Sequence, residues 1–426
     1  MNILRINKIG LFLIWVLMGL SMGVLQAQQH LSIPYSRFGW GEMQPRTSAA
    51  VRGMGRTAYA YADAICVNAS NPASYIRFDS LSSVIDAAFS FQSHVLYENS
   101  ARQSGSTAFM DYLYIGLPVT SHWSTAFGLQ PFSVVNYNYS RTEEPCTRHD
   151  QGTGGTYELF WGNAWEISHY FSVGLQASYL FGTGNRLHEL LFDDNSYINV
   201  KTEDISRVRG LLLNTGLQAW IPIGKKKLGL AAVYSPSIPA LLRVEHQVNR
   251  VSYQLSGSSE SPIDTLAWSA SDKEVSKQRL TNPTVLGCGI SLAEEEHFWT
   301  GFDFTWTGWS GFSNGTSDSL RDACRVSWGA RLIPQINSSR YWKKMSYTFG
   351  LFYERDYVVL PMQEMWRNGL TVGISFPMRK SKTRVSAYAE FGNYRGAGNS
   401  GIREQYTTLT LQVQLHEKWY QRRKLD

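Results

Sequence analysis

Charged residues are scarce in this chain, and long apolar runs are scarcer still. Asp, Glu, Lys and Arg make up 17% of the 426 residues, against about 25% in an ordinary soluble domain. The only long apolar run lies at the N-terminus, which argues against a polytopic helical membrane protein. Aromatic residues, in contrast, reach 13%. This composition excludes disordered, collagen-like and coiled-coil chains and favours many short amphipathic strands.

Cysteine is also rare, and its spacing carries no metal signature. The four cysteines are Cys66, Cys146, Cys288 and Cys324, with no CxxC or Cys/His spacing, so we expect no metal site. A disulfide is compatible with export, but spacing cannot select a pair. The formal net charge is only +6 and both signs are scattered, so we expect no nucleic-acid partner.

Catalytic motifs are missing as well. The sequence contains neither a GxSxG elbow nor an HExxH helix, and its nine histidines are spread along the chain. Acidic clusters such as Asp193-Asp194 fall in expected loops, where solvated charges are the simplest interpretation. We therefore expect no catalytic residues and no cofactor, and we interpret the protein as a non-enzyme.

The N-terminus resembles an export signal. Arg5 and Lys8 precede an apolar stretch from Ile9 to Leu20, and small and mixed residues lead to Ala27. This is the order of a secretory signal peptide, which we place at residues 1–27. An N-terminal anchor is the alternative, but the apolar core is short for a span of about 20 residues.

Strict alternation is the dominant pattern in the rest of the chain. It is clearest in Phe171–Phe181, Leu370–Phe376 and Leu409–Leu415, where apolar residues alternate with Gly, Ser, Thr and Gln. A soluble sandwich also alternates, but its solvent face carries many Lys and Glu residues. A lipid-facing wall around a polar lumen fits this charge-poor pattern better, and only a closed barrel satisfies its backbone in a bilayer.

Residues 80–419 are predicted to form this wall. Alternate connections are short and polar, as in outer-membrane barrels, and the others are longer. We predict an all-β, transmembrane antiparallel barrel of about 14 strands in the outer membrane of a Gram-negative bacterium, followed by a periplasmic tail at 420–426. The predicted strands are 80–98, 106–119, 122–141, 153–168, 169–188, 198–222, 226–249, 272–293, 297–311, 321–336, 344–356, 366–378, 383–395 and 404–419. Aromatic residues near strand ends are expected to form interfacial girdles: Trp123, Tyr137, Tyr139, Trp161, Trp165, Trp299, Trp306, Trp309, Trp342 and Trp419.

Residues 28–79 do not alternate like wall strands. They contain the segments Arg52-Gly53-Met54-Gly55 and Asn71-Pro72-Ala73 within many small residues. Ahead of a barrel, these two segments resemble the long-chain fatty acid transporter (FadL) family, as a divergent branch. The resemblance implies that 28–79 is a hatch or plug inside a fourteen-strand barrel and that these seven residues are hatch elements. Arg56 stands where the family carries another glycine, and the family's ligand-contacting residues cannot be matched.

Three functions follow as alternatives. The resemblance implies transport or binding of hydrophobic small molecules across the outer membrane. A second possibility is a non-transporting subunit of an outer-membrane secretion or protein-assembly complex, with outer-membrane or periplasmic protein partners. A third is a general porin, which would need a charged lumen and no plug. Outer-membrane lipid is an expected partner in every case, and the ligand-binding residues stay unassigned.

Overall fold

The structure is a computed structural model that describes residues 34–80, 82–98, 101–194, 197–238, 242–256, 259–262, 274–280, 282–294, 297–310, 320–360, 363–378, 381–396 and 403–418. The signal peptide at 1–27, Trp419 and the tail at 420–426 lie outside these residues. Strands dominate the described part of the chain, and no helix in it is long and apolar enough to cross a membrane. The helices are η1 (Pro34–Arg37), α2 (Ala49–Arg52), η2 (Pro72–Arg77) and α3 (Tyr341–Lys344).

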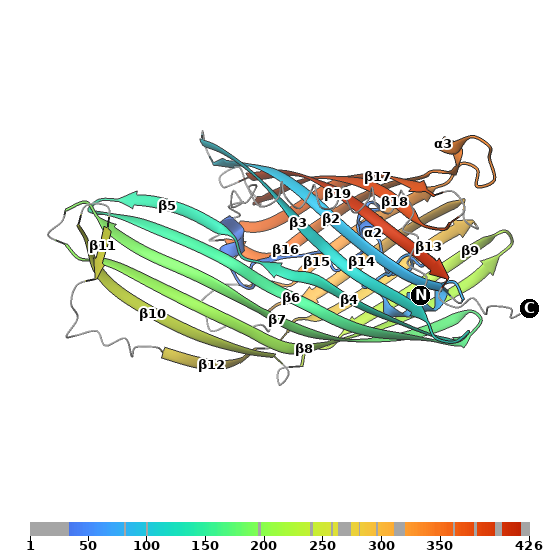
Figure 1. The fold of residues 1–426 in the computed structure, drawn as a ribbon, viewed down its shortest axis with the longest axis horizontal. Coiled ribbons are helices and arrows are strands. Elements are labelled where there is room, and N and C mark those ends of the chain that lie inside the picture. The colour runs from blue at the N-terminus through green and yellow to red at the C-terminus, as the bar shows by residue number, and fades with distance from the viewer. Residues whose placement is uncertain are drawn as a thin grey trace, which may run out of the picture.

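Nineteen strands form one continuous antiparallel sheet that closes where the last strand pairs with β2 (Figure 1). The strands are β1 (Glu42–Met43), β2 (Ser82–Glu98), β3 (Ala101–Pro118), β4 (Trp123–Val134), β5 (Tyr137–Glu143), β6 (Cys146–Ser168), β7 (Phe171–Phe192), β8 (Asn199–Ile223), β9 (Lys226–Ser235), β10 (Leu242–Ser256), β11 (Ser259–Pro262), β12 (Glu274–Leu280), β13 (Thr284–Glu294), β14 (Phe298–Gly308), β15 (Ala323–Leu332), β16 (Ser346–Leu360), β17 (Gln363–Pro377), β18 (Arg384–Gly396) and β19 (Arg403–Lys418).

The wall itself has fourteen crossings. Eleven strands each make one crossing, while β4 with β5, β9 with β10, and β12 with β13 make three more as interrupted strands. For example, β10 pairs with the first half of β8, and β9 pairs with its second half. The predicted all-β, closed fourteen-strand antiparallel barrel is therefore confirmed.

The connections divide between the two ends of the barrel. The predicted short turns gather at one end, which is the periplasmic end by the rule for such barrels. The turn predicted at Ser168–His169, for example, lies at His169–Tyr170 between β6 and β7. Several predicted long loops at the other end are instead extended strands. Residues 142–152 and 189–192, for instance, continue β5, β6 and β7.

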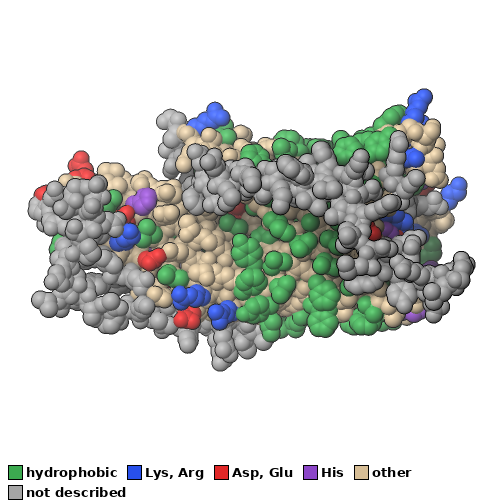
Figure 2. Space-filling view, viewed as in Figure 1, with side chains coloured by type: hydrophobic (Ala, Val, Ile, Leu, Met, Phe, Trp, Pro, Cys, Tyr) green, Lys and Arg blue, Asp and Glu red, His purple; other side chains and the backbone are tan. Residues whose placement is uncertain are grey.

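An apolar belt surrounds the wall near the periplasmic end. On β16, Phe349, Leu351 and Tyr353 face outward with 37%, 43% and 53% exposure, while Phe352 faces the lumen at 4%. Figure 2 shows outward apolar side chains gathered in a band across this part of the molecule. Burying this band in hydrocarbon is what an exported β-barrel requires.

The predicted aromatic girdles are only partly correct. Trp161, Trp165 and Trp342 are exposed on the outside as expected. Tyr137, Trp299 and Trp309 are buried instead, because their positions in the alternation point inward. An aromatic residue near a strand end therefore faces lipid only when its place in the register is outward.

Strands on one side rise far beyond the belt. β6, β7 and β8 contain 23, 22 and 25 residues, whereas a tilted strand crosses a bilayer in about 9–11. Figure 1 shows β5–β8 with β10 and β11 extending beyond the rest of the barrel. This outer extension is polar, and for that reason alternation did not reveal it. The predicted large loop at 250–271 contains a hairpin of β10 and β11 in its described part.

Residues 34–80 lie inside the barrel and are called the lumen segment below. Their side chains are mostly buried, and their polar contacts reach β3, β6, β14, β15 and β18 of the wall. Figure 1 shows α2 inside the barrel. One apolar cluster joins Val51, Met54 and Tyr75 of this segment to Tyr112, Tyr114 and other inward residues of the wall. The lumen segment is thus held against the wall by buried apolar contacts.

Candidate functional site

The first of the two small-residue segments ends α2 and touches the wall directly. Gly55 has φ +67°, a conformation that glycine adopts without strain. A Cβ on Gly55 would lie 2.7 Å from the backbone nitrogen of Leu351. The wall also has glycines at this point, where a side chain would clash with the segment. A Cβ on Gly350 would lie 2.0 Å from the nitrogen of Gly55, and a Cβ on Gly329 would lie 2.2 Å from the Met54 carbonyl oxygen.

The second segment begins η2 and meets a second pair of wall glycines. The Asn71 side chain caps the helix by accepting from the Ala73 amide at 3.0 Å, and Pro72 takes the favoured first position. A Cβ on Gly174 of β7 would lie 2.2 Å from the Ala73 nitrogen, and one on Gly216 of β8 would lie 2.0 Å from Asn71 Oδ1. Backbone therefore packs on backbone in both regions.

Two arginines of the lumen segment bind carboxylates of the wall. Arg52 lies 2.8 Å from Asp111, and Arg56 lies 2.7 Å from Glu390. Arg56, with φ +64°, also stacks its guanidinium 4.6 Å from the Phe352 ring centre. The sequence departs from the family pattern at this residue, and here the departure supplies a buried ion pair.

The wall also offers a carboxylate to the lumen backbone. Asp303 Oδ2 on β14 accepts from the amides of Ala58 and Tyr59 at 2.6 and 2.8 Å. From β8, three strands away in the wall, Gln218 Nε2 donates to the Tyr59 carbonyl at 2.8 Å. Buried backbone groups of an irregular segment need such partners, and inward polar side chains supply them.

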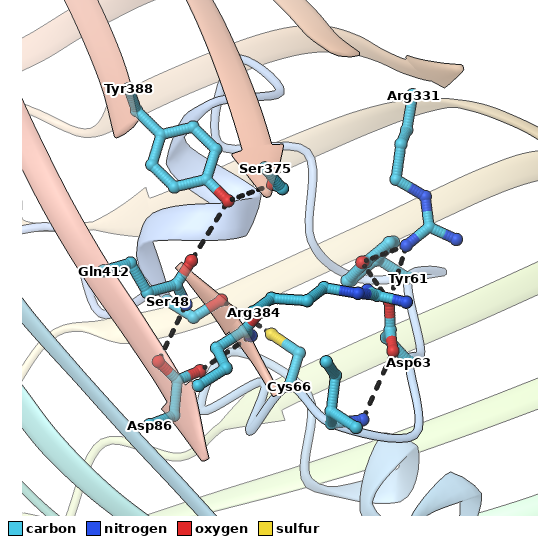
Figure 3. A network of polar contacts seen from close by, with 12 residues as sticks. Ser48, Tyr61, Asp63, Cys66, Asp86, Arg331, Ser375, Arg384, Tyr388 and Gln412 are labelled. Carbon is cyan, nitrogen blue, oxygen red and sulfur yellow. Dashed lines mark hydrogen bonds and ion pairs between the residues drawn. The ribbon is translucent and has the colours of Figure 1, made fainter. Parts of the chain in front are cut away.

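Asp63 anchors the periplasmic side of the lumen segment (Figure 3). Its Oδ2 lies 2.5 Å from Arg331 on β15 and 3.1 Å from Arg384 on β18, and Tyr61 donates to it at 3.0 Å. Burial alone raises the pKa of the Asp63 carboxyl, but the two arginines lower that pKa by more, so it lies well below its usual range.

A second polar network lies beside it (Figure 3). Asp86 of β2 accepts from Gln412 Nε2 at 2.7 Å and from Tyr112 at 3.0 Å, and Tyr112 in turn accepts from the Ala49 amide at 2.8 Å. Next to it, the Ser48 hydroxyl contacts Cys66 Sγ at 3.0 Å. Burial raises the pKa of the Cys66 thiol well above its usual value, so this thiol is protected while the segment is in place. All four cysteines are unpaired.

A cavity of about 210 Å³ lies between the lumen segment and the wall. Its apolar side includes Met43, Phe132, Leu212, Trp309 and Tyr357. A dry cavity of about 150 Å³ is enough to hold benzene. The volume therefore suits one aromatic ring or a short aliphatic chain.

The cavity also has charged lining residues. It is lined by Arg46, Arg56, Arg325 and Arg367 together with Glu354 and Asp356. Arg46 and Arg367 bind Glu158 and Glu42. Among the described residues, Arg325 has no carboxylate within 4.0 Å and reaches only Thr305 Oγ1 at 3.4 Å. It is the cation of this cavity that is available to an anionic group of a ligand.

The wall next to the cavity contains a seam. β3 pairs with β4 only from Leu113 to Pro118. In the described part of the chain, the rest of β3 pairs with β2 alone, and β5 pairs with β6 alone. Leu113 and Leu129 form the last residue pair between β3 and β4 before the two strands separate, and both face outward. The seam therefore begins within the apolar belt and continues toward the extracellular end of the barrel.

The short strand β1 of the lumen segment covers this seam from inside. Glu42 and Met43 pair with Val134 and Ser133 of β4, at the edge that β3 leaves open. Arg367 holds Glu42 at 3.1 Å, and Met43 also lines the cavity. Cavity, covering strand and seam are therefore contiguous.

The inward carboxylates and arginines were not predicted as site residues. Asp303 stands between Phe302 and Phe304 and is the one charged residue of β14, and a charge in a membrane-spanning segment is a functional signal. The seven predicted residues all lie in the lumen segment, and each of the two motifs meets its own pair of wall glycines. Their role as hatch elements stays a prediction.

The closed wall, the outward apolar belt and the polar, filled lumen define a FadL-like outer-membrane β-barrel. A family model named BamG matches residues 6–426, and the chain belongs to the BamG family. The predicted FadL-like fold and outer-membrane location in a Gram-negative bacterium are confirmed.

Solved structures of the same fold include three transport proteins. A Pseudomonas aeruginosa FadL homologue aligns with 10% identity over 89% of this chain and 100% of its own, at a TM-score of 0.58. The toluene transporters TbuX of Ralstonia pickettii and TodX of P. putida align with 12% and 13% identity, each over 89% of this chain and 100% of theirs, at TM-scores of 0.60 and 0.59. At such identities the likeness concerns the fold. A search of curated proteins finds no match.

Proposed function

We propose that this barrel binds a hydrophobic small molecule in the lumen cavity and passes it through the seam between β3 and β4. The observation that carries the proposal is the contiguity of cavity, covering strand and seam. A path of this kind keeps an apolar solute in contact with apolar side chains, so the solute avoids both the polar network below and the polar extension above. The toluene transporters with this fold support the same class of cargo.

In this proposal the lumen segment acts as the hatch, and β1 is its movable part. β1 has two residues and two backbone partners, whereas the two glycine-seated motifs are held by extensive backbone contact. Displacing β1 alone would connect the cavity to the outer leaflet while Asp63 and the two motifs stay in place. The domain division, with residues 28–79 as hatch, follows as part of this proposal.

Locking β1 to the wall tests the path. Met43 and Ser133 are direct Cα partners in an antiparallel pair, a spacing that a disulfide can bridge. In a background without the native cysteines, the variant M43C/S133C is expected to lose at least about 90% of labelled toluene or C18 fatty-acid uptake when oxidised, because β1 cannot leave the seam. Reduction should restore uptake.

A second disulfide, which leaves β1 and the β3–β4 seam unlinked, is the matched control. Asn393 and Gln405 are partners between β18 and β19, and N393C/Q405C should leave uptake unchanged in either redox state. Equal uptake by the oxidised M43C/S133C barrel and by this control would rule out passage through the seam.

Filling the cavity tests the binding site. Leu212 of β8 lines the cavity and is 6% exposed, whereas its neighbour Leu211 faces outward at 44%. L212W should reduce ligand binding by roughly tenfold or more, because the indole occupies the space of the ligand. L211W places the same ring toward lipid and should bind normally. Equilibrium binding of a labelled hydrocarbon to the purified barrels measures the difference.

A second candidate function is a subunit of an outer-membrane secretion or protein-assembly complex. Membership of the BamG family and the firm anchoring of the lumen segment both favour it, since a permanently filled barrel can serve as a scaffold. Gentle detergent extraction separates the two functions. A defined complex that persists with the oxidised M43C/S133C barrel, together with unchanged uptake on deletion of the gene, would support the scaffold.

A further inference from the structure

A basic and aromatic turn projects from the periplasmic end between β15 and β16. It spans residues 333–345 and contains α3. Tyr341 and Trp342 are 46% and 52% exposed, and the neighbouring basic residues are Arg340, Lys343 and Lys344. The sequence of this turn contains no Asp or Glu. Exposed aromatic rings beside uncompensated cations form a surface that suits an anionic partner.

Hydrogen bonds place the turn on the outer side of the wall. The Tyr347 hydroxyl donates to the Trp342 carbonyl at 3.0 Å, and the Tyr341 hydroxyl donates to the Pro377 carbonyl at 3.1 Å. Tyr347 lies two residues before Phe349 on β16, in the series that faces outward. Figure 1 shows α3 at the outer edge of the barrel's periplasmic end. The turn is therefore beside the lower edge of the apolar belt and not beneath the lumen.

The turn is also ordered before any partner arrives. Gln335 donates its amide to the Lys343 carbonyl at 2.8 Å, and Ile333 donates to the His297 carbonyl at 2.7 Å. The Lys343 ammonium lies 5.6 Å from the centre of the Trp342 ring. Rings and cations held in this way lose little conformational freedom on binding.

We propose that the turn at 333–345 binds anionic phospholipid headgroups of the periplasmic leaflet. Trp342 and Tyr341 occupy the interface between headgroups and acyl chains, where such rings are favoured. Arg340, Lys343 and Lys344 attract the phosphates from the same level. This surface lies on the outside of the barrel and is independent of whether the lumen carries cargo. It gives the barrel a lipid preference on one side of its circumference.

Lipid retention by the purified barrel tests the proposal. The protein is held in neutral detergent micelles, offered equal amounts of phosphatidylglycerol and phosphatidylcholine, and examined by native mass spectrometry. The native barrel should retain phosphatidylglycerol preferentially. The variant R340Q/K343Q/K344Q should lose that preference by about tenfold or more, because three cations near the surface are removed. W342A should weaken retention of both lipids.

The β8–β9 turn provides a matched control with the same change in charge. The turn and the first residues of β9 carry Lys225, Lys226 and Lys227, but Lys226 lies 3.9 Å from Glu294 and no aromatic residue stands among them. K225Q/K226Q/K227Q should therefore retain phosphatidylglycerol like the native chain. Retention unchanged by R340Q/K343Q/K344Q, with all barrels folded by their mobility in unheated gels, would overturn the proposal. So would equal retention of both lipids by the native barrel while a periplasmic protein binds this turn.

Discussion

Asp63→Asn is expected to free the lumen segment from the periplasmic side of the barrel. The Asp63 side chain is 8% exposed and neutralises both Arg331 and Arg384. Removing one partner of a buried ion pair costs about 3–5 kcal/mol, because it leaves buried charge without a partner. The open form should therefore become more populated by a factor on the order of a hundred or more.

Cys66 reports this opening directly. It is buried in the segment, and its rate of reaction with a pyridyl disulfide follows the open population once Cys146, Cys288 and Cys324 are replaced by serine. Lys382→Gln is the control, because Lys382 is 58% exposed and its partner Asp79 is 29% exposed. Such a pair contributes at most about 1 kcal/mol. Equal Cys66 reactivity in the two variants would show that Asp63 is not an anchor.

The same carboxylate predicts a pH dependence with a definite sign. The pKa of Asp63 is lower in the folded barrel than in a released segment, where it would be about 3.9. Its contribution is therefore complete above about pH 4 and is lost as the pH falls further. Native Cys66 reactivity should rise below about pH 4, whereas D63N should already be reactive at neutral pH and show no such rise.

Gly174→Ala should dislodge the second motif from the wall. The added Cβ would lie 2.2 Å from the Ala73 nitrogen and 2.3 Å from the Pro72 carbonyl carbon. Both are backbone atoms and cannot rotate away. Overpacking of this kind costs about 1–3 kcal/mol or more, while alanine is well tolerated in the strand itself. Cys66 reactivity should rise by roughly tenfold or more, with the barrel still folded.

Gly184→Ala on the same strand is the matched control. A Cβ at Gly184 meets nothing within 4 Å, so the substitution should leave Cys66 as protected as in the native chain. If G174A behaves like G184A, the glycine contact does not hold the lumen segment.

The sequence was sufficient to predict the membrane-spanning part of the wall, because lipid imposes alternation on it. Residues 171–181 and 370–376 lie in β7 and β17 as predicted. Residues 142–152 and 189–192 were predicted as loops because neither segment alternates: residues 142–152 are mostly polar, and residues 189–192 are Glu-Leu-Leu-Phe. The break between β9 and β10 follows Pro236, which cannot donate to a ladder.

The site was less accessible to sequence reasoning. Gly55 and the Asn71-Pro72-Ala73 segment have recognisable local signatures, but their partners Gly350 and Gly174 look like ordinary strand glycines. Nothing along the chain indicates that Asp63 meets Arg331 and Arg384, which are 268 and 321 residues away. Only closure of the barrel brings them together.

The unequal height of the wall has a consequence for how the barrel meets the cell surface. Some 15 residues of β8 beyond those needed to cross the bilayer would rise roughly 35 Å at the usual tilt. That height is available on the β4–β8 flank of the seam, while β3 forms the other flank. Large surface polymers and antibodies should therefore reach the seam from the β3 flank only. The barrel is therefore asymmetric about its axis, and a large neighbour in the envelope that uses the seam must lie on the β3 flank.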